Sequence, residues 1–509
     1  MSDATNEAPR RAEALETLDP QDWDAMRRLA HRMIDDAFAG VREVRDRPAW
    51  RPMPAEVGAR FDTPLPRTPE GAEQAYEDYL ELVSPYRMGN DHPRFWAYYL
   101  GTGTVLGALA EFVAAMDASN LGGGATGAAR VEQQVTAWCR SFLGMPEGTN
   151  GLMTSGASMA NLIGLAVART QATDVDLRAE GVAAVGAPLV TYASVEVHSC
   201  HQRALELMGL GARSLRKLPV DDEFRLDLAA LEAAIAEDRA AGAIPMAVVA
   251  NAGSINTGSV DDLHAIADLC ARERIWFHVD AAIGAPVKLA PTLSGLVDGL
   301  ERADSVALDL HKWMHMPFEA GMVLVRDEDA HRAAFAYSAA YLSHTARGLA
   351  GAPMWFHEYG PQLSRGFKAL KVWMSLKEHG ADRFGRLVER NIEQAHALTG
   401  RLKATGQVDV LAPVVLDVVC FQVRPPGIPP SDVSERELAA FQEELLLRIQ
   451  ESGEAVPSNT TLTDGRTCMR VAISNHRTND EDLERFVEVL LKLATELARE
   501  PEVWRPGEA

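Results

Sequence analysis

The sequence predicts an α/β fold built on a largely parallel sheet, and two observations support this prediction. Between residues 150 and 325, short apolar runs alternate with longer amphipathic segments, which is typical of strands joined by covering helices. Several of these runs end in polar residues, as at Thr154, Asp280 and His311. Ligands of parallel sheets bind at the carboxyl ends of the strands, so we expect the functional site at that edge.

The alternating region contains six expected strands and the helices between them. The strands are expected at 150–154, 188–192, 246–251, 275–280, 305–310 and 321–325, and the helices at 158–169, 198–208 and 261–272. A long helix at 364–379 leads to a second, α+β unit. This unit is expected to hold helices at 382–404, 434–451 and 480–499 and strands at 416–423 and 467–473. The predicted division is an N-terminal helical arm and dimerisation segment (1–104), a large domain (105–379) and a small C-terminal domain (380–509).

The N-terminal arm has little core of its own. Two amphipathic helices flank a Pro-rich extended stretch at 48–69, so we expect them to pack on another part of the molecule or on a second subunit. The aromatic segment 92–100 is expected to be a buried strand. Gly101 follows it, which indicates a backbone that lies close to a ligand.

Composition excludes several classes of partner. The 509 residues carry a net charge of −22, which argues against nucleic acid and anionic membranes because both require a basic surface. The five cysteines are scattered and form no C-x-x-C pair, so we expect free thiols and no zinc site or other metal site. The N-terminus has no apolar signal segment, and no apolar run reaches the length of a membrane span. We therefore expect a cytoplasmic protein.

Four strand ends carry residues that could bind a ligand or take part in catalysis. Residues 154–158, Thr-Ser-Gly-Ala-Ser, form a small-residue turn before a helix, which favours an anion such as phosphate, although a plain helix cap is the simpler alternative. His198 follows the next strand. Asp280 ends an apolar strand and is followed by two alanines, which leave room for a planar group unless the carboxylate only caps a turn. Lys312 lies among apolar neighbours, which favour a neutral, nucleophilic amine unless the side chain extends to solvent.

Together these residues match one cofactor. A phosphate cradle, a stacking imidazole, a buried carboxylate and a Schiff-base lysine are the groups that bind pyridoxal 5'-phosphate. The chain has no G-x-G-x-x-G or Walker A motif, so the phosphate need not belong to a nucleotide.

The chain resembles the pyridoxal-phosphate-dependent group II amino acid decarboxylases, and is most similar to the aromatic-L-amino-acid branch. The most specific markers are the segments His-Val-Asp-Ala-Ala at 278–282 and His-Lys-Trp at 311–313. The resemblance implies fold type I, which is aspartate-aminotransferase-like, with a mostly parallel seven-stranded sheet. It also implies a homodimer whose active site lies at the subunit interface, and decarboxylation of an L-amino acid to an amine and CO2.

The resemblance assigns roles to individual residues. Lys312 would form the Schiff base, Asp280 would pair with the pyridine nitrogen, and Ala282 and His198 would contact the two ring faces. Tyr341 would return a proton to Cα. The other implied residues are Ala157, Ser158, Ser305 and Ser364 at the phosphate, His311 beside it or beside the substrate, and Tyr98, Tyr99 and Leu100 in the substrate pocket.

Departures from the family pattern leave alternatives open. Ile255 stands where the family has a threonine, so a hydroxyl near Asp280 is missing or comes from Ser254 or Thr257. Ser364 replaces a glycine. The alternatives are an aromatic aldehyde synthase, a decarboxylase of a non-aromatic amino acid such as glutamate, an aminotransferase, and a non-catalytic cofactor-binding protein. Arg94 is the only arginine that the sequence suggests for a substrate side-chain carboxylate.

Overall fold

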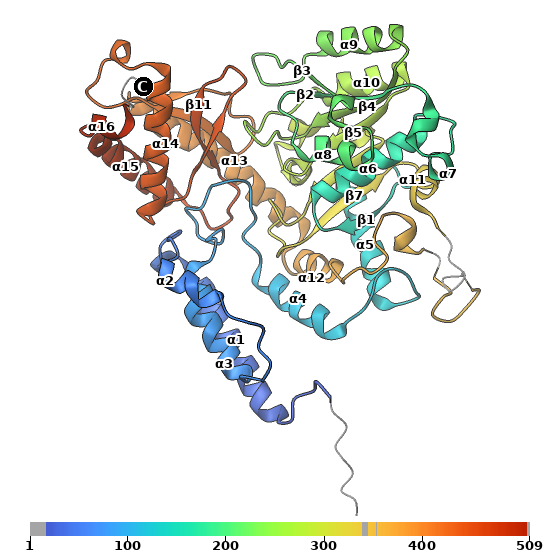
Figure 1. The fold of residues 1–509 in the computed structure, drawn as a ribbon, viewed down its shortest axis with the longest axis horizontal. Helices are drawn as coiled ribbons and strands as arrows, with labels where there is room; N and C mark the ends of the chain where they lie inside the picture. Colours follow the sequence, from blue (N-terminus) through green and yellow to red (C-terminus); the bar gives the residue numbers. More distant parts are fainter. Residues whose placement is uncertain (1–16, 338–344, 353, 506–509) are drawn as a thin grey trace, which may run out of the picture. The chain divides into compact units, whose positions relative to one another are not determined.

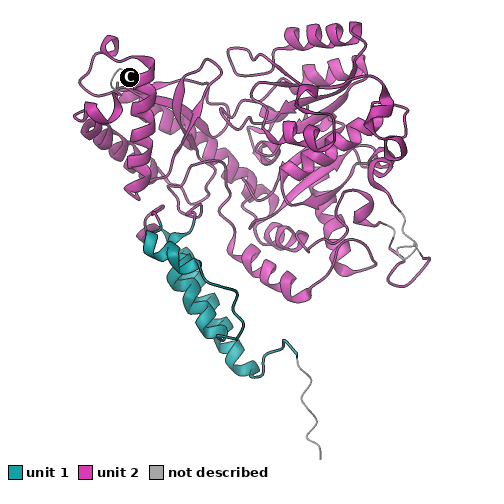
Figure 2. Cartoon of the chain, viewed as in Figure 1, with its two compact units in different colours: residues 1–44, 53–87 teal, residues 45–52, 88–509 magenta. Residues whose placement is uncertain are grey.

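The computed structural model describes residues 17–337, 345–352 and 354–505. These residues form two compact units, coloured separately in Figure 2. One unit comprises residues 1–44 and 53–87, and the other comprises residues 45–52 and 88–509. The predicted division at residues 104 and 379 stays a prediction.

The smaller unit is a helical arm. Its longest helix, α1 (Trp23–Arg42), begins where the Asp22 carboxylate accepts the Ala25 N–H. A second helix, α3 (Ala72–Asp78), pairs with α1 through a hydrogen bond of 2.9 Å from the Tyr76 hydroxyl to Asp36. Few side chains of α1 are buried, which agrees with the expected lack of a core. The short helix α2 (Ala55–Gly58) lies between them in sequence.

The larger unit contains a seven-stranded sheet with the strand order β1-β7-β6-β5-β4-β2-β3 (Figure 1). Only β7 runs antiparallel to its neighbours, so the predicted α/β class with a mostly parallel sheet is confirmed. The strands are β1 (Asn150–Thr154), β2 (Leu189–Ser194), β3 (Leu215–Leu218), β4 (Ile244–Asn251), β5 (Trp276–Asp280), β6 (Ser305–Asp309) and β7 (Gly321–Val325).

Helices cover this sheet. The apolar helix α6 (Ala157–Gln171) packs across β7, β6 and β5, and nine of its fifteen residues are buried. It therefore lies directly against the strands that carry Asp280 and Lys312. The other helices of this region are α4 (Val105–Asp117), α5 (Gly127–Phe142), α7 (Leu177–Glu180), α8 (Cys200–Leu207), α9 (Leu228–Ala240), α10 (Leu263–Glu273), α11 (Glu328–Phe335) and α12 (Ala369–His379).

The C-terminal region has a second core around an antiparallel sheet with the order β10-β11-β9-β8. Its strands are β8 (Val408–Val410), β9 (Val418–Val423), β10 (Ser458–Thr461) and β11 (Thr467–Ala472). Its helices are α13 (Ala381–Ala404), α14 (Glu435–Glu451), α15 (Asp480–Leu497) and α16 (Pro501–Trp504).

The structure corrects some predicted elements. The segment 92–100 is not a strand, because only Phe95 forms a bridge, to Val456, and Tyr98 adopts a left-handed φ of 59° that breaks the side-chain alternation. Strands β3, β8 and β10 were not predicted, because β3 and β8 have only four and three residues and β10 is entirely polar. Among the described residues, no helix has the length and apolar content to cross a membrane.

A buried ion pair joins helix α5 to the edge strand β1. The Arg365 guanidinium donates to Glu132 (2.5 Å) and to the Met153 carbonyl (2.6 Å). Glu132 also accepts the Met153 N–H, and both charged side chains are almost fully buried. Two buried charges of opposite sign compensate each other, whereas either one alone would be left without a counter-charge.

Arg365→Leu is therefore expected to lower the free energy of unfolding by about 3–5 kcal/mol, because it leaves Glu132 charged and unpaired. Urea unfolding followed by circular dichroism measures this change. Arg401→Leu removes the exposed pair with Glu484 and should cost less than about 1 kcal/mol. Equal losses for the two variants would contradict the role of the buried pair.

Candidate active site

A cavity of about 360 Å³ lies at the carboxyl ends of the parallel strands, where the sequence predicts the site. Most of the predicted cofactor residues line it. They are Ala157, Ser158, His198, Asp280, Ala282, His311 and Lys312, joined by residues that the prediction did not include, such as Ser155, Asn161 and Asn251.

Lys312 lies in the turn after β6, and its amine has an ionic partner. The Nζ atom lies 3.1 Å from the Asp309 carboxylate, so apolar neighbours alone do not define its environment. The neutral amine stays a prediction. Gly101 explains how this turn packs, because a Cβ there would lie 2.1 Å from the His311 carbonyl oxygen. The close approach predicted at Gly101 is thus to the lysine turn itself.

Asp280 ends β5 as a buried, ionised carboxylate. It accepts hydrogen bonds from His201 Nε2 and Asn161 Nδ2, both 2.9 Å from Oδ2, and from the Ala282 N–H, 3.1 Å from Oδ1. Burial alone would raise the pKa of Asp280. The hydrogen bond and charge of His201, the charge of Lys312 and the Ala282 N–H outweigh burial and hold this pKa well below its ordinary value.

Asn161 and His201 are functional residues that the sequence prediction missed. A spacing signal existed for each, because Asn161 lies one helical turn after Ala157 and His201 lies one turn after His198. Of the two alternatives for a hydroxyl near Asp280, the described residues favour its absence. Ser254 and Thr257 hydrogen-bond to each other over 2.9 Å, whereas the hydrogen bonds to the Asp280 carboxylate come from Asn161, His201 and the Ala282 N–H.

The N-terminus of α6 forms one end of the cavity. The Ala157 N–H donates to Asp309 Oδ1 over 2.7 Å, so Asp309 contacts both this helix end and Lys312. The side chains of Ser155 and Ser158 also line the cavity. Short hydroxyl side chains at a helix N-terminus suit a phosphate group.

The two remaining histidines occupy different environments. His198 lines the cavity with an exposed side chain, and its Nδ1 accepts the Cys200 N–H. His311 is buried, its Nδ1 accepts the Ala320 N–H, and its ring packs on Phe318. Burial lowers the pKa of His311, which favours the neutral imidazole.

Two predicted residues of the described chain do not line this cavity, and the position of a third is not described. Ser305 begins β6, at the opposite end from Lys312, and its buried hydroxyl is bonded to Trp276 and His278, so the structure does not support a phosphate contact. Ser364 is exposed and does not line the cavity. Tyr341 lies outside the described residues.

Of the predicted substrate residues, Tyr98 lines a cavity next to the first. This neighbouring cavity measures about 460 Å³ and shares Ile255 with the first. The Tyr99 side chain points elsewhere, since it is buried and donates to Asp417 over 2.8 Å. Leu100 packs in a small cluster with Ala97 and Phe95 and lines neither cavity.

Arg470 is a second residue that the prediction missed. It comes from β11, is nearly fully buried, and lines the cavity beside Tyr98. Its Nη2 atom has no hydrogen-bond partner within the described chain. Arg94, the arginine suggested by the sequence, instead contacts Glu454 and Asp482.

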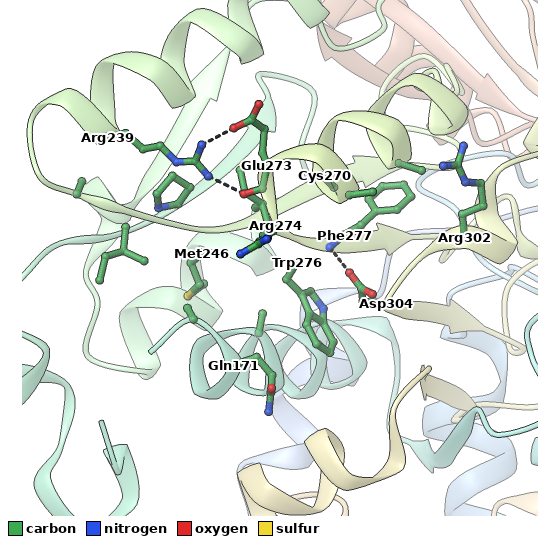
Figure 3. Close-up of a pocket in the computed structure, with 18 residues that line it drawn as sticks. Gln171, Arg239, Met246, Cys270, Glu273, Arg274, Trp276, Phe277, Arg302 and Asp304 are labelled. Carbon is green, nitrogen blue, oxygen red and sulfur yellow. Dashed lines mark hydrogen bonds and ion pairs between the residues drawn. The ribbon is translucent and has the colours of Figure 1, made fainter. Parts of the chain in front are cut away.

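A larger cavity, of about 690 Å³, lies at the amino ends of the strands, on the other side of the sheet from their carboxyl ends (Figure 3). It is lined by residues at the amino ends of strands, including Met246, Trp276 and Asp304, and by Arg239, which pairs with Glu273. It holds neither Asp280 nor Lys312. The smaller cavity is the candidate active site because the reactive groups converge there.

Cys200, His201 and Asp280 place three metal-type ligand atoms within 4.8 Å of one another. His201 and Asp280 already bond each other, and burial raises the pKa of the Cys200 thiol to about 12. A thiol that keeps its proton is a poor metal ligand, so this cluster is better described as the hydrogen-bonded support of Asp280.

These groups fit pyridoxal 5'-phosphate. The site offers an amine from Lys312, an ionised and buried carboxylate from Asp280, and hydroxyl side chains at the start of α6. A carboxylate that stays ionised can hold a pyridinium proton, and the helix N-terminus suits the phosphate.

Comparisons with known proteins agree with this fit. A family model described as the pyridoxal-dependent decarboxylase conserved domain matches residues 54–424. An aromatic-L-amino-acid decarboxylase of Bacillus atrophaeus is 30% identical over 93% of this chain and 96% of that protein. A phenylacetaldehyde synthase of Arabidopsis thaliana is 27% identical over 94% of this chain and 98% of that protein.

Solved structures share the fold. The crystal structure of Oryza sativa TDC with PLP and tryptamine has a TM-score of 0.86 at 24% identity, covering 95% of this chain and all of that one. The glutamate decarboxylase domain of a Vibrio parahaemolyticus protein has a TM-score of 0.81 at 24% identity, covering 94% of this chain and 97% of that one. The larger unit therefore has the fold-type-I architecture that the resemblance implied.

The buried histidines predict how acid affects stability. Burial lowers the pKa of His278 to about 3 and that of His331 to about 4. Between these values and the ordinary pKa near 6.5, the unfolded chain binds more protons than the folded chain, so the free energy of unfolding should fall as pH falls from 6.5 towards 4.

His331→Gln tests this expectation outside the cavity, because glutamine can still donate to the Tyr359 carbonyl that His331 Nε2 contacts at 2.7 Å. The variant should reduce the slope of unfolding free energy against pH by up to about 1.4 kcal/mol per pH unit. Urea unfolding at pH 6.5, 5.5 and 4.5 measures the slope. Identical slopes in the parent and the variant would refute the assignment.

Proposed function

This chain belongs to the pyridoxal-dependent decarboxylase family and is a pyridoxal-phosphate-dependent amino acid decarboxylase, and we propose that its substrate is an aromatic L-amino acid. The observation that carries the catalytic part is the convergence of Lys312 and the ionised Asp280 on one cavity. The relatives that support the substrate class are named aromatic-L-amino-acid decarboxylase, phenylacetaldehyde synthase and tyrosine decarboxylase.

When bound, pyridoxal phosphate supplies an aldehyde that captures amines and a ring that accepts the electron pair left by departing CO2. Lys312 would hold the cofactor covalently and give way to the substrate amine. Asp280 would keep the proton on the ring nitrogen. Ala282 and His198 would bound the ring, Ser158 and the Ala157 end of α6 would bind the phosphate, and His311 would lie beside it.

Tyr341 would return a proton to Cα after CO2 leaves. This role rests on the sequence segment Ala-Ala-Tyr-Leu at 339–342, which resembles the family's loop tyrosine. A tyrosine at this position and a histidine at 198 favour release of an amine over an aldehyde.

The cavity beside Tyr98 would receive the substrate side chain. Tyr98 and Ile255 provide aromatic and apolar surface there, which suits an aromatic substrate. Arg470 favours a second candidate, an amino acid with an acidic side chain, because its unpartnered Nη2 would pair with a carboxylate. Ser364 would contribute to the phosphate only if a second subunit brought it to the site.

We also propose a homodimer with its active site at the subunit interface. Helix α4 exposes Val105, Phe112, Val113 and Met116 in the single chain, and such contiguous apolar surface on one helix is typical of a protein interface. A cytoplasmic location accords with the five free, buried cysteines, which suit a reducing compartment.

A panel of amino acids tests the substrate class. We expect amine and CO2 from phenylalanine, tyrosine, tryptophan or dihydroxyphenylalanine, with kcat/KM at least about a hundredfold above that for glutamate or aspartate, because the aromatic and apolar surface of Tyr98 and Ile255 favours an aromatic side chain over a hydrated carboxylate. Mass spectrometry measures the amines released, and separate assays measure aldehyde and peroxide. Preference for acidic substrates would favour the Arg470 alternative, and aldehyde with peroxide would identify an aldehyde synthase.

Lys312→Ala tests the catalytic assignment. The variant should lose turnover and the visible absorbance of lysine-bound cofactor, because Lys312 is the only lysine among the described residues that line the cavity. Absorption spectra and amine release measure the two effects. Lys288→Ala, which removes an amine paired with Asp298 and Glu301 outside the cavity, serves as the control. Retention of both signals in Lys312→Ala would overturn the assignment.

A further inference from the structure

We propose that a directed hydrogen-bond chain of four side chains, the half-buried Trp276 and the buried Ser305, His278 and Asn161, positions Asp280 towards the ring nitrogen of the cofactor. From the end farthest from Asp280 inward, the members of this hydrogen-bond chain are Trp276, Ser305, His278 and Asn161. It deepens the proposed function, because it rests on Asp280 as the partner of the ring nitrogen.

Each link is a short hydrogen bond. The Trp276 indole N–H donates to the Ser305 hydroxyl over 2.8 Å, and that hydroxyl lies 2.7 Å from His278 Nδ1. His278 Nε2 lies 2.8 Å from the Asn161 carbonyl oxygen. The Asn161 amide then donates to Asp280 Oδ2 over 2.9 Å.

Donor and acceptor chemistry fixes the direction of these bonds. A carboxylate can only accept, so the Asn161 amide N–H faces Asp280 and the Asn161 carbonyl oxygen faces His278 Nε2. His278 must therefore carry a proton on Nε2 and donate it to Asn161. Burial lowers the pKa of His278 to about 3, so the imidazole is neutral and its Nδ1 accepts the Ser305 hydroxyl. An indole N–H can only donate, so the Ser305 oxygen accepts from Trp276.

The fold places the chain at one face of the sheet. Trp276, His278 and Asp280 alternate along β5 and therefore point to the same side. Ser305 is the register partner of His278 on β6, so its hydroxyl lies beside the imidazole.

Helix α6 lies close enough to β5 to complete the hydrogen-bond chain because residue 164 is a glycine. A Cβ at Gly164 would lie 2.8 Å from His278 Nδ1 and 3.1 Å from the Ser305 hydroxyl. The side chain of any other residue at 164 would clash with the hydrogen bond between Ser305 and His278. The absence of a side chain there lets Asn161, one turn earlier on the same helix, reach both His278 and Asp280.

The chain orients Asp280 without adding charge. Burial lowers the pKa of His278 to about 3, so the imidazole stays neutral at physiological pH. Together with His201, the chain supplies two donors to Oδ2, and the Ala282 N–H engages Oδ1. The carboxylate thus has fixed partners on both oxygens before any cofactor binds. Asn161, His278, Ser305 and Trp276 act as positioning residues.

The direct test is the protonation of His278 in the cofactor-loaded enzyme. In 15N-histidine-labelled protein, the His278 signals are assigned by their loss in His278→Gln. The parent enzyme should show a proton on Nε2 and none on Nδ1 at pH 7. A proton on Nδ1, alone or with Nε2, would overturn the proposal.

Ser305→Ala breaks the chain at a residue that does not line the cavity. It should raise the dissociation constant of pyridoxal phosphate about tenfold, because the orphaned Trp276 and His278 nitrogens no longer fix Asn161. It should also mix the two His278 tautomers. Ser305→Thr keeps the hydroxyl and should restore both readouts.

Thr191→Val is the matched control. It removes a buried hydroxyl from β2 of the same sheet, and this hydroxyl has no hydrogen-bond partner among the described residues. If Ser305→Ala weakens cofactor binding no more than Thr191→Val does, the proposal fails. If the parent enzyme shows the predicted tautomer and the variants show the predicted cofactor affinities, but no amine is released, the proposed function is refuted. The proposed role of the hydrogen-bond chain would still hold.

Discussion

The site depends on keeping one carboxylate charged inside the protein. Asp280 is almost fully buried, and an isolated buried charge would take up a proton instead. Three donors prevent this, and each comes from a different part of the fold: Asn161 from α6, His201 from α8 and the Ala282 N–H from the turn after β5. The packing of both helices on the sheet therefore helps to keep Asp280 ionised.

Much of this arrangement was predictable from the sequence, for local reasons. Short apolar runs between longer amphipathic segments identified β5 and β6, and the strand-end rule placed Asp280 and Lys312 at the same end of the sheet. These inferences needed only the apolar runs and their order along the chain. The side chains expected there already matched pyridoxal phosphate, and the family resemblance then supplied the reaction and the roles of individual residues.

What the sequence did not reveal depends on tertiary contacts. Asn161 reaches Asp280 only because Gly164 lets α6 approach β5 closely. Ser305 was assigned to the phosphate, yet it begins its strand and so lies at the far end from the cavity. Tyr99 was assigned to the substrate pocket, but the left-handed backbone at Tyr98 turns these neighbours in different directions, one to a cavity and one to Asp417.

Two carboxylates, Asp309 and Asp280, lie near Lys312, and their hydrogen-bond and ionic partners differ. Asp309 pairs directly with Lys312 and with the helix end at Ala157, so its hydrogen bonds are tied to the state of the amine and of the phosphate site. The low pKa of Asp280 rests first on His201 against the opposing effect of burial, and Lys312 contributes less. Under the proposed function, Lys312 would hold the cofactor, and Asp309 would then lose this ionic partner. Asp280 would keep its hydrogen-bond donors Asn161, His201 and the Ala282 N–H, and could therefore hold the proton on the ring nitrogen.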